Sequence, residues 1–95
     1  MVFGLVKARH EKIRVDHYIF DGKLDDVFGF SEMYDQAVKR LAMMPAGQDK
    51  AIVYVTGLTT AMLAVVKACI DMGLKLDAMH WCKKTDNFIR QAVIE

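Results

Sequence analysis

The sequence predicts an α/β protein with a small open, mainly parallel sheet, two helices and a C-terminal β-hairpin. Residues 51–55 are continuously apolar, which is typical of a central parallel strand covered on both faces. Apolar residues recur at helical spacing before and after this strand, and a strand-helix-strand connection makes the strands that it joins parallel. Near the end of the chain, two apolar segments flank a polar turn, which indicates the hairpin.

Two strands are expected before the first helix. Residues 2–8 form a short inner strand, and Gly4 within it indicates a close backbone approach. Residues 13–20 alternate with a period of two, which suits an edge strand or an extended arm. A turn is expected at Asp21-Gly22, and residues 24–30 then form a short helical turn or a loop.

Each of the two predicted helices has recognisable ends. The first is expected to use Ser31 as its N-cap and to end at Pro45-Ala-Gly. The second spans residues 59–72, with Thr59 as a good N-cap and Gly73 as the C-cap.

The last part of the chain is expected to add two strands. Residues 74–81 form the strand after the second helix, and a polar turn at residues 82–87 leads into residues 88–94. A chain of 95 residues makes a single domain, because it is too short to build two cores.

The second helix is apolar on nearly every side. Between Ala61 and Met72 only Lys67 and Asp71 carry a charge, so one face should meet the sheet and the other a second copy of the protein. The whole chain is 54% hydrophobic, which also favours a homo-oligomer, at least a dimer. The residues available for the two faces are Met62, Leu63, Val65, Val66, Cys69 and Ile70.

Composition argues against several classes of partner. Thirteen basic and twelve acidic residues give a net charge of +1, which disfavours binding to long nucleic acid or to an anionic membrane. The two cysteines, Cys69 and Cys82, form neither a disulfide framework nor a zinc motif, and no other metal or cofactor is indicated. The chain shows no signal-peptide core and no run of ~20 apolar residues, so we expect a soluble, cytoplasmic protein.

The candidate site lies where the predicted parallel strands end. In open α/β sheets, ligands bind outside the carboxyl ends of the strands. The residues expected at this edge, together with one basic residue of the last strand, are Arg9, His10, Thr56, Gly57, Thr59, Thr60, His80, Trp81 and Arg90.

This set of side chains suits a phosphate joined to a base. Arg9 offers a guanidinium fork to phosphate oxygens, and the start of the second helix adds hydroxyls and backbone N–H groups. Trp81 offers a plane for stacking. Structural roles are the alternative: Thr59 caps a helix without any ligand, Arg9 pairs with Asp77 or Glu11, and Trp81 and the histidines serve packing and hydrogen bonding.

One segment of the chain resembles known proteins. The stretch Ile52-Val-Tyr-Val-Thr-Gly-Leu-Thr-Thr-Ala-Met62, followed by the helix and by Asp77-Ala-Met-His-Trp81, is similar to small uncharacterised proteins of phages and prophages. The turn with its flanks is also similar to the strand-turn-helix of CARF domains, which bind cyclic oligonucleotides across a dimer interface. The amino-terminal half matches no CARF pattern. The resemblance implies ligand contacts at Thr56, Gly57, Thr59 and Thr60, and a phage protein that captures a nucleotide-type immune signal.

Three functions are compatible with these observations. The first is a non-catalytic binding protein that captures a cyclic nucleotide or an ADP-ribose derivative. A phage counter-defence sponge is an example of such a protein. The second is an interaction protein that inhibits a host protein through its sheet edge or its apolar helix. The third is a metal-independent phosphodiesterase in which two histidines and Arg9 act on the substrate. The sequence lacks a nucleophile elbow and a strand-end carboxylate pair, which makes binding without turnover the simpler hypothesis.

Overall fold

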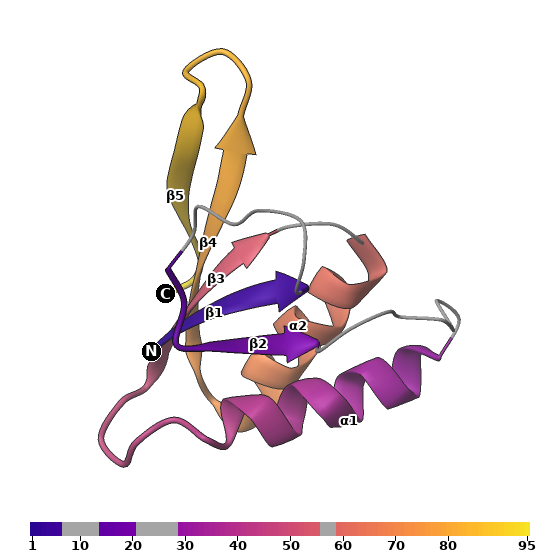
Figure 1. The fold of residues 1–95 in the computed structure, drawn as a ribbon. Helices are drawn as coiled ribbons and strands as arrows, with labels where there is room; N and C mark the ends of the chain where they lie inside the picture. The colour runs from indigo at the N-terminus through magenta and orange to yellow at the C-terminus, as the bar shows by residue number, and fades with distance from the viewer. Residues whose placement is uncertain (7–13, 21–28, 56–58) are drawn as a thin grey trace.

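The computed structural model describes residues 1–6, 14–20, 29–55 and 59–95, and it confirms the predicted fold class (Figure 1). A five-stranded, mostly parallel sheet carries two helices and ends in an antiparallel hairpin. The elements are β1 (Val2–Val6), β2 (His17–Phe20), α1 (Phe30–Leu41), β3 (Lys50–Val55), α2 (Thr59–Met72), β4 (Lys75–Cys82) and β5 (Asn87–Ile94).

The strand order in the sheet is β2-β1-β3-β4-β5. The first four strands are parallel, and β5 runs antiparallel to β4. Residues 17–20 therefore form an edge strand, as one of the two interpretations of residues 13–20 predicted. The expected turn at Asp21-Gly22 and most of the segment 24–30 lie outside the described residues.

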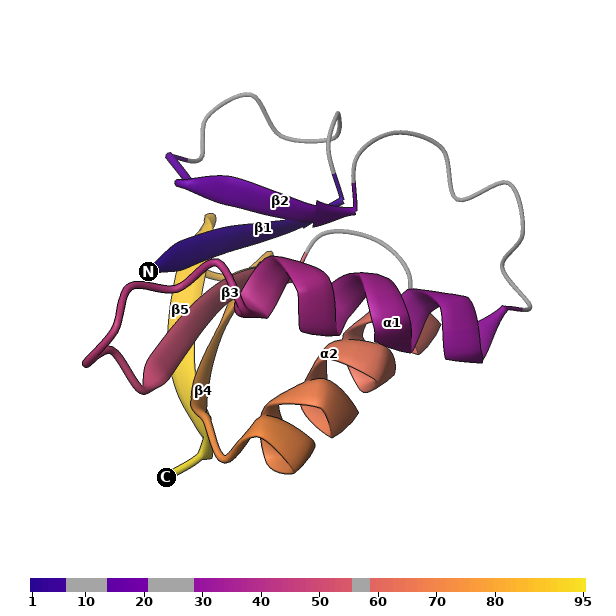
Figure 2. The same cartoon turned by 90° about the horizontal axis from the view of Figure 1, so that it is seen from below.

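Both helices cover the same face of the sheet (Figure 2). The chain moves from β2 through α1 to β3, passing over β1, and then in the same direction through α2 to β4. Right-handed crossovers that advance in one direction place their helices on one face. The other face carries no described helix, and we call it the helix-free face. Residues 51–55, expected to be covered on both faces, are fully buried only on the helix side, at Ala51 and Val53, whereas Ile52 and Tyr54 are half-buried on the helix-free face.

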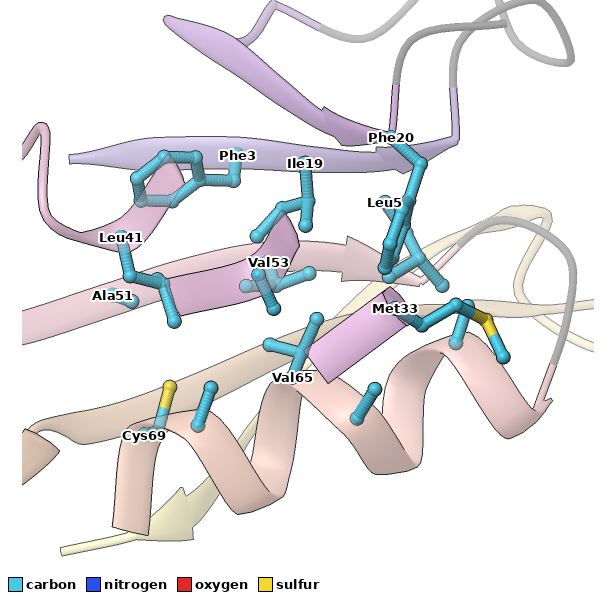
Figure 3. Close-up of a cluster of buried hydrophobic side chains, with 14 of the residues drawn as sticks. Phe3, Leu5, Ile19, Phe20, Met33, Leu41, Ala51, Val53, Val65 and Cys69 are labelled. Atoms are coloured by element: carbon cyan, nitrogen blue, oxygen red, sulfur yellow. The ribbon is translucent and has the colours of Figure 1, made fainter. Parts of the chain in front are cut away.

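The core lies between the sheet and the two helices (Figure 3). Phe3 of β1 and Val53 of β3 are register partners and are both fully buried on the helix side. From α1, Met33, Ala37 and Leu41 reach this layer at a spacing of four residues. The core side of α2 consists mainly of small residues, which lets it lie close to α1 and the sheet: Ala61, Ala64, Val65, Ala68 and Cys69.

The ends of α1 differ from the sequence-based expectation. The N-cap is Gly29 rather than Ser31, no side chain bonds to the cap, and the helix ends at Leu41 with Ala42 as its C-cap. The predicted C-cap at Gly73 is confirmed by its positive φ of 70°. Thr59, the predicted N-cap of α2, is instead the first residue of the helix, and the position before it lies outside the described residues.

Gly4 allows a close approach, as predicted, although the neighbour is an aromatic ring rather than backbone. A Cβ atom added at Gly4 would lie 2.5 Å from Cε1 of Tyr18, its register partner on β2. The Tyr18 ring therefore packs over Gly4 on the helix-free face, since Phe3 and Leu5 on either side point into the core.

Candidate functional site

The four parallel strands end at one edge of the sheet, which we call the carboxyl edge. Val6 at the end of β1 is level with Phe20 at the end of β2, and Val55 at the end of β3 is level with His80. From β1 the chain continues to β2, its neighbour on one side in the strand order, and from β3 it continues to β4, its neighbour on the opposite side. The boundary between β1 and β3 is therefore a topological switch point, where ligands of open α/β sheets bind.

Two of the predicted site residues begin α2 at this edge. Thr59 and Thr60 are the first two residues of the helix, and both are exposed. The helix starts directly after the β3 connection, so its amino end faces the carboxyl edge. Free N–H groups of a first helical turn attract anions. Arg9, His10, Thr56 and Gly57 lie outside the described residues.

The other three predicted residues lie on the hairpin, and two of them, Trp81 and Arg90, lie on the helix-free face, opposite α2. His80 is half-buried and level with the last residue of β3. Trp81 is 43% exposed, and its ring meets Phe88 edge-on at a centroid distance of 5.2 Å. Phe88 in turn contacts Tyr54 edge-on at 4.9 Å, which places this aromatic group on the helix-free face.

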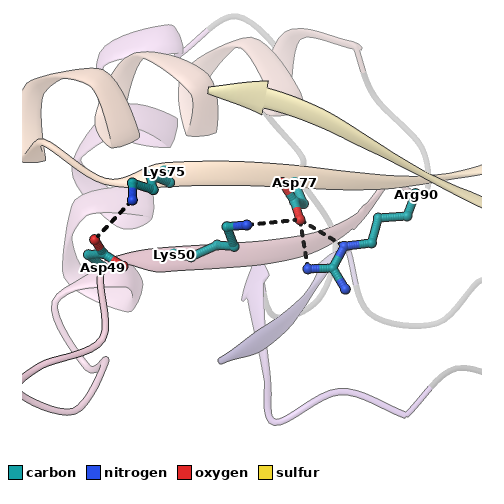
Figure 4. A network of polar contacts seen from close by, with 5 residues as sticks. All are labelled: Asp49, Lys50, Lys75, Asp77 and Arg90. Atoms are coloured by element: carbon teal, nitrogen blue, oxygen red, sulfur yellow. Dashed lines mark hydrogen bonds and ion pairs between the residues drawn. The ribbon is translucent and has the colours of Figure 1, made fainter. Parts of the chain in front are cut away.

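Arg90 also lies on the helix-free face, where it is bound by a carboxylate (Figure 4). Its Nε and Nη2 atoms each lie 2.7 Å from Oδ2 of Asp77. Lys50 approaches the same oxygen at 3.5 Å. The hydrogen bonds from Arg90, with the nearby charge of Lys50, hold the pKa of Asp77 below its usual range, although burial opposes the shift. Among the described residues, Asp77 thus pairs with Arg90 and Lys50. Arg9, for which the sequence suggests Asp77 or Glu11 as a structural partner, lies outside the described residues.

The two thiols have different surroundings. Burial raises the pKa of Cys69 to about 11. Cys82 is half-buried beside the hairpin turn, where hydrogen bonds from Thr85 and from the Lys84 backbone lower its pKa. Within the described ranges no group of three or more His, Cys, Asp or Glu side chains is arranged to hold a metal ion. In the same ranges, no helix has the length and hydropathy of a membrane span.

The roles of Asp77 and Tyr54 were not predicted, although the sequence contains a signal for Asp77. With a turn at residues 83–86, Cys82 is opposite Asn87. Three residues further along each strand, Met79 is opposite Arg90. Asp77 then lies diagonally opposite Arg90 on the same face, and Trp81 lies opposite Phe88. The contact between Tyr54 and Phe88 arises because β3 lies beside β4 in the sheet. This strand order cannot be read from the pattern of adjacent residues.

Comparison with protein-family models, with curated proteins and with solved structures finds no match to this chain.

Proposed function

We propose that this chain is a non-catalytic binding protein that captures a phosphate-bearing nucleotide at the carboxyl edge of its sheet. The observation that carries the proposal is the switch point between β1 and β3, with the amino end of α2 beside it. Thr59 and Thr60 are exposed there, in the first turn of the helix, and the N–H groups of a first helical turn are suited to bind an anion.

The sequence adds the groups that would complete such a site. Arg9 and His10 follow β1 in the chain, and Thr56 and Gly57 follow β3. We assign the main phosphate contact to Arg9, because the guanidinium of Arg90 is held by Asp77. His80 at the end of the parallel ladder is then the group available for a base, whereas Trp81 lies with Phe88 and Tyr54 on the helix-free face.

The proposed ligand is a cyclic nucleotide or an ADP-ribose derivative, and sequestering such a signal would suit a phage counter-defence protein.

Isothermal titration calorimetry and thermal shift should be run against 3′,5′-cyclic AMP, a cyclic dinucleotide and ADP-ribose, with adenosine as the phosphate-free control. The proposal expects micromolar or tighter binding of at least one phosphate-bearing ligand and none of adenosine. Recovery of the intact ligand after denaturation would exclude the phosphodiesterase alternative. Absence of binding to the whole panel would reject the proposal.

A second candidate function is inhibition of a protein target through α2. Leu63 and Ile70 lie seven residues apart on this helix, about two turns, and are 56% and 61% exposed. A pull-down from host lysate should then recover one stoichiometric partner with the wild-type chain. The Ile70→Asp variant should lose that partner, while Asp35→Asn on the exposed side of α1 should retain it.

A further inference from the structure

The outer side of β5 is an unprotected strand edge. Among the described strands β5 has a neighbour on one side only, and it is eight residues long, whereas the other edge strand β2 has four. Proteins protect such edges with short strands, proline or charges. β5 contains no proline and carries a single charged residue, Arg90, which bonds to Asp77 of the neighbouring strand β4.

The regular part of this edge is limited by a β-bulge. Leu76 pairs with Ile94, but the next residue, Asp77, pairs with Ala92, so Val93 is an extra residue on β5. Side chains alternate regularly between the two faces only from Asn87 to Ala92. A second strand that joins this edge must find its register within these six residues.

We propose that β5 pairs antiparallel with β5 of a second copy of this chain, with Ile89 on the two-fold axis. A two-fold axis perpendicular to the sheet keeps each residue and its symmetry copy on the same face. Directly opposed residues of paired strands also share a face, so the axis must lie between one residue and its own copy. Within the regular part, five-residue pairings can be centred on Ile89 or on Arg90. Centring on Arg90 places two cations opposite each other, which disfavours that register.

The register centred on Ile89 is complementary at each position. Ile89, 39% exposed in the single chain, packs against its own copy. Phe88 lies opposite Arg90 of the second copy, an aromatic–cation pair, and Asn87 lies opposite Gln91. Glu95 extends toward the turn of the second copy, which carries Lys83 and Lys84. The outer N–H and C=O groups of β5 gain backbone partners in place of water.

A cysteine on the two-fold axis tests this register directly. Opposed residues of antiparallel strands have Cα atoms ~4.5–5.5 Å apart, within the range for a disulfide. In a Cys82→Ser background, Ile89→Cys should form an intermolecular disulfide under mild oxidation. Val93→Cys is the matched control: it is on the same strand and 45% exposed in the wild type, but it lies outside the pairing and should cross-link little. Cys69 is buried and will not interfere.

Sedimentation velocity supplies the second test and does not depend on any ligand. The wild-type chain should contain dimer at ~100 µM, Ile89→Lys should be monomeric, and Val93→Lys should associate like the wild type. Circular dichroism checks that each variant is folded. Equal cross-linking of the two cysteine variants, a wild-type monomer, or a dimer that survives Ile89→Lys would overturn the proposal. None of these outcomes bears on nucleotide capture at the carboxyl edge.

Discussion

Asp77 is the buried charged residue of the described chain, and its ion pair makes stability depend on pH. Its folded-state pKa is lowered chiefly by hydrogen bonds from Arg90. Because this pKa is lower in the folded state, the ion pair stabilises the protein at pH values above the unfolded-state pKa of about 3.9. The stabilisation is lost as the pH falls through the folded-state pKa.

Replacing Arg90 should therefore have a pH-dependent cost. Arg90→Gln should reduce the free energy of unfolding at pH 7, because the buried carboxylate loses its main donor, and the difference from wild type should shrink near pH 3. Urea unfolding at both pH values measures this. Lys75→Gln is the control. Lys75 lies 3.6 Å from Asp49, and both side chains are exposed, so this variant should change stability little at either pH. A cost of Arg90→Gln that stays constant with pH would contradict this account of Asp77.

The two cysteines should differ in reactivity by more than their exposure alone implies. A pKa of about 11 leaves roughly one Cys69 side chain in a thousand as thiolate at pH 8, and burial also blocks access. Cys82 is partly exposed, with a lowered pKa. One thiol should react quickly with a disulfide reagent in the folded protein, and the second only after unfolding. Peptide mapping that finds Cys69 labelled first would show that this assignment is wrong.

Arg9 is the residue whose replacement should affect binding most selectively. If it binds a phosphate, Arg9→Ala removes a charge-assisted hydrogen bond and should weaken affinity by about 1.5–3 kcal/mol, with little change in the Tm of the free protein. Arg14→Ala removes the same charge from an exposed position before β2, near the opposite edge of the sheet, and should leave affinity unchanged. A lower Tm with unaltered affinity for Arg9→Ala would instead assign it a structural role.

At the level of elements, the contact between β1 and β2 depends on the absence of a side chain at Gly4. Gly4→Ala places a Cβ atom 2.5 Å from the Tyr18 ring, so the ring must move, and we expect a loss of ~1–3 kcal/mol in the free energy of unfolding. The double variant Gly4→Ala/Tyr18→Ala should recover part of this loss, because the clash is absent. Denaturant unfolding of both single variants and of the double variant gives the coupling energy. Additive effects would show that the ring is not the obstacle.

Helices and strands were predictable where their pattern is local, and their ends were not. The apolar run of β3, the spacing along α2 and the positive-φ glycine at Gly73 are each read from adjacent residues. Ser31 is a favourable cap, yet the helix starts at Phe30, with Gly29 as its N-cap. The N–H of Met33 donates to the Gly29 carbonyl at 2.9 Å, so the helical hydrogen bonds extend back past Ser31.

At the level of the whole molecule, the sequence predicted the open parallel sheet but not which strands are neighbours. Strand order places Tyr54 beside Phe88 and leaves one face without helices, and both facts arise from non-local pairing. For the same reason, the described residues of the predicted site lie in two regions: at the carboxyl edge with the amino end of α2, and on the helix-free face in an aromatic and charged group around Trp81 and Arg90.

The central claim is that a phosphate-bearing nucleotide binds at the carboxyl edge, and an ¹⁵N-HSQC titration tests it most directly. With 3′,5′-cyclic AMP, a cyclic dinucleotide and ADP-ribose as probes, the account predicts that one probe shifts the amide signals of Thr59, Thr60 and His80. The amides of Lys50 and Lys75, at the amino ends of β3 and β4, should stay in place. Shifts confined to the amino ends, or no shifts with any probe at millimolar concentration, would contradict the claim.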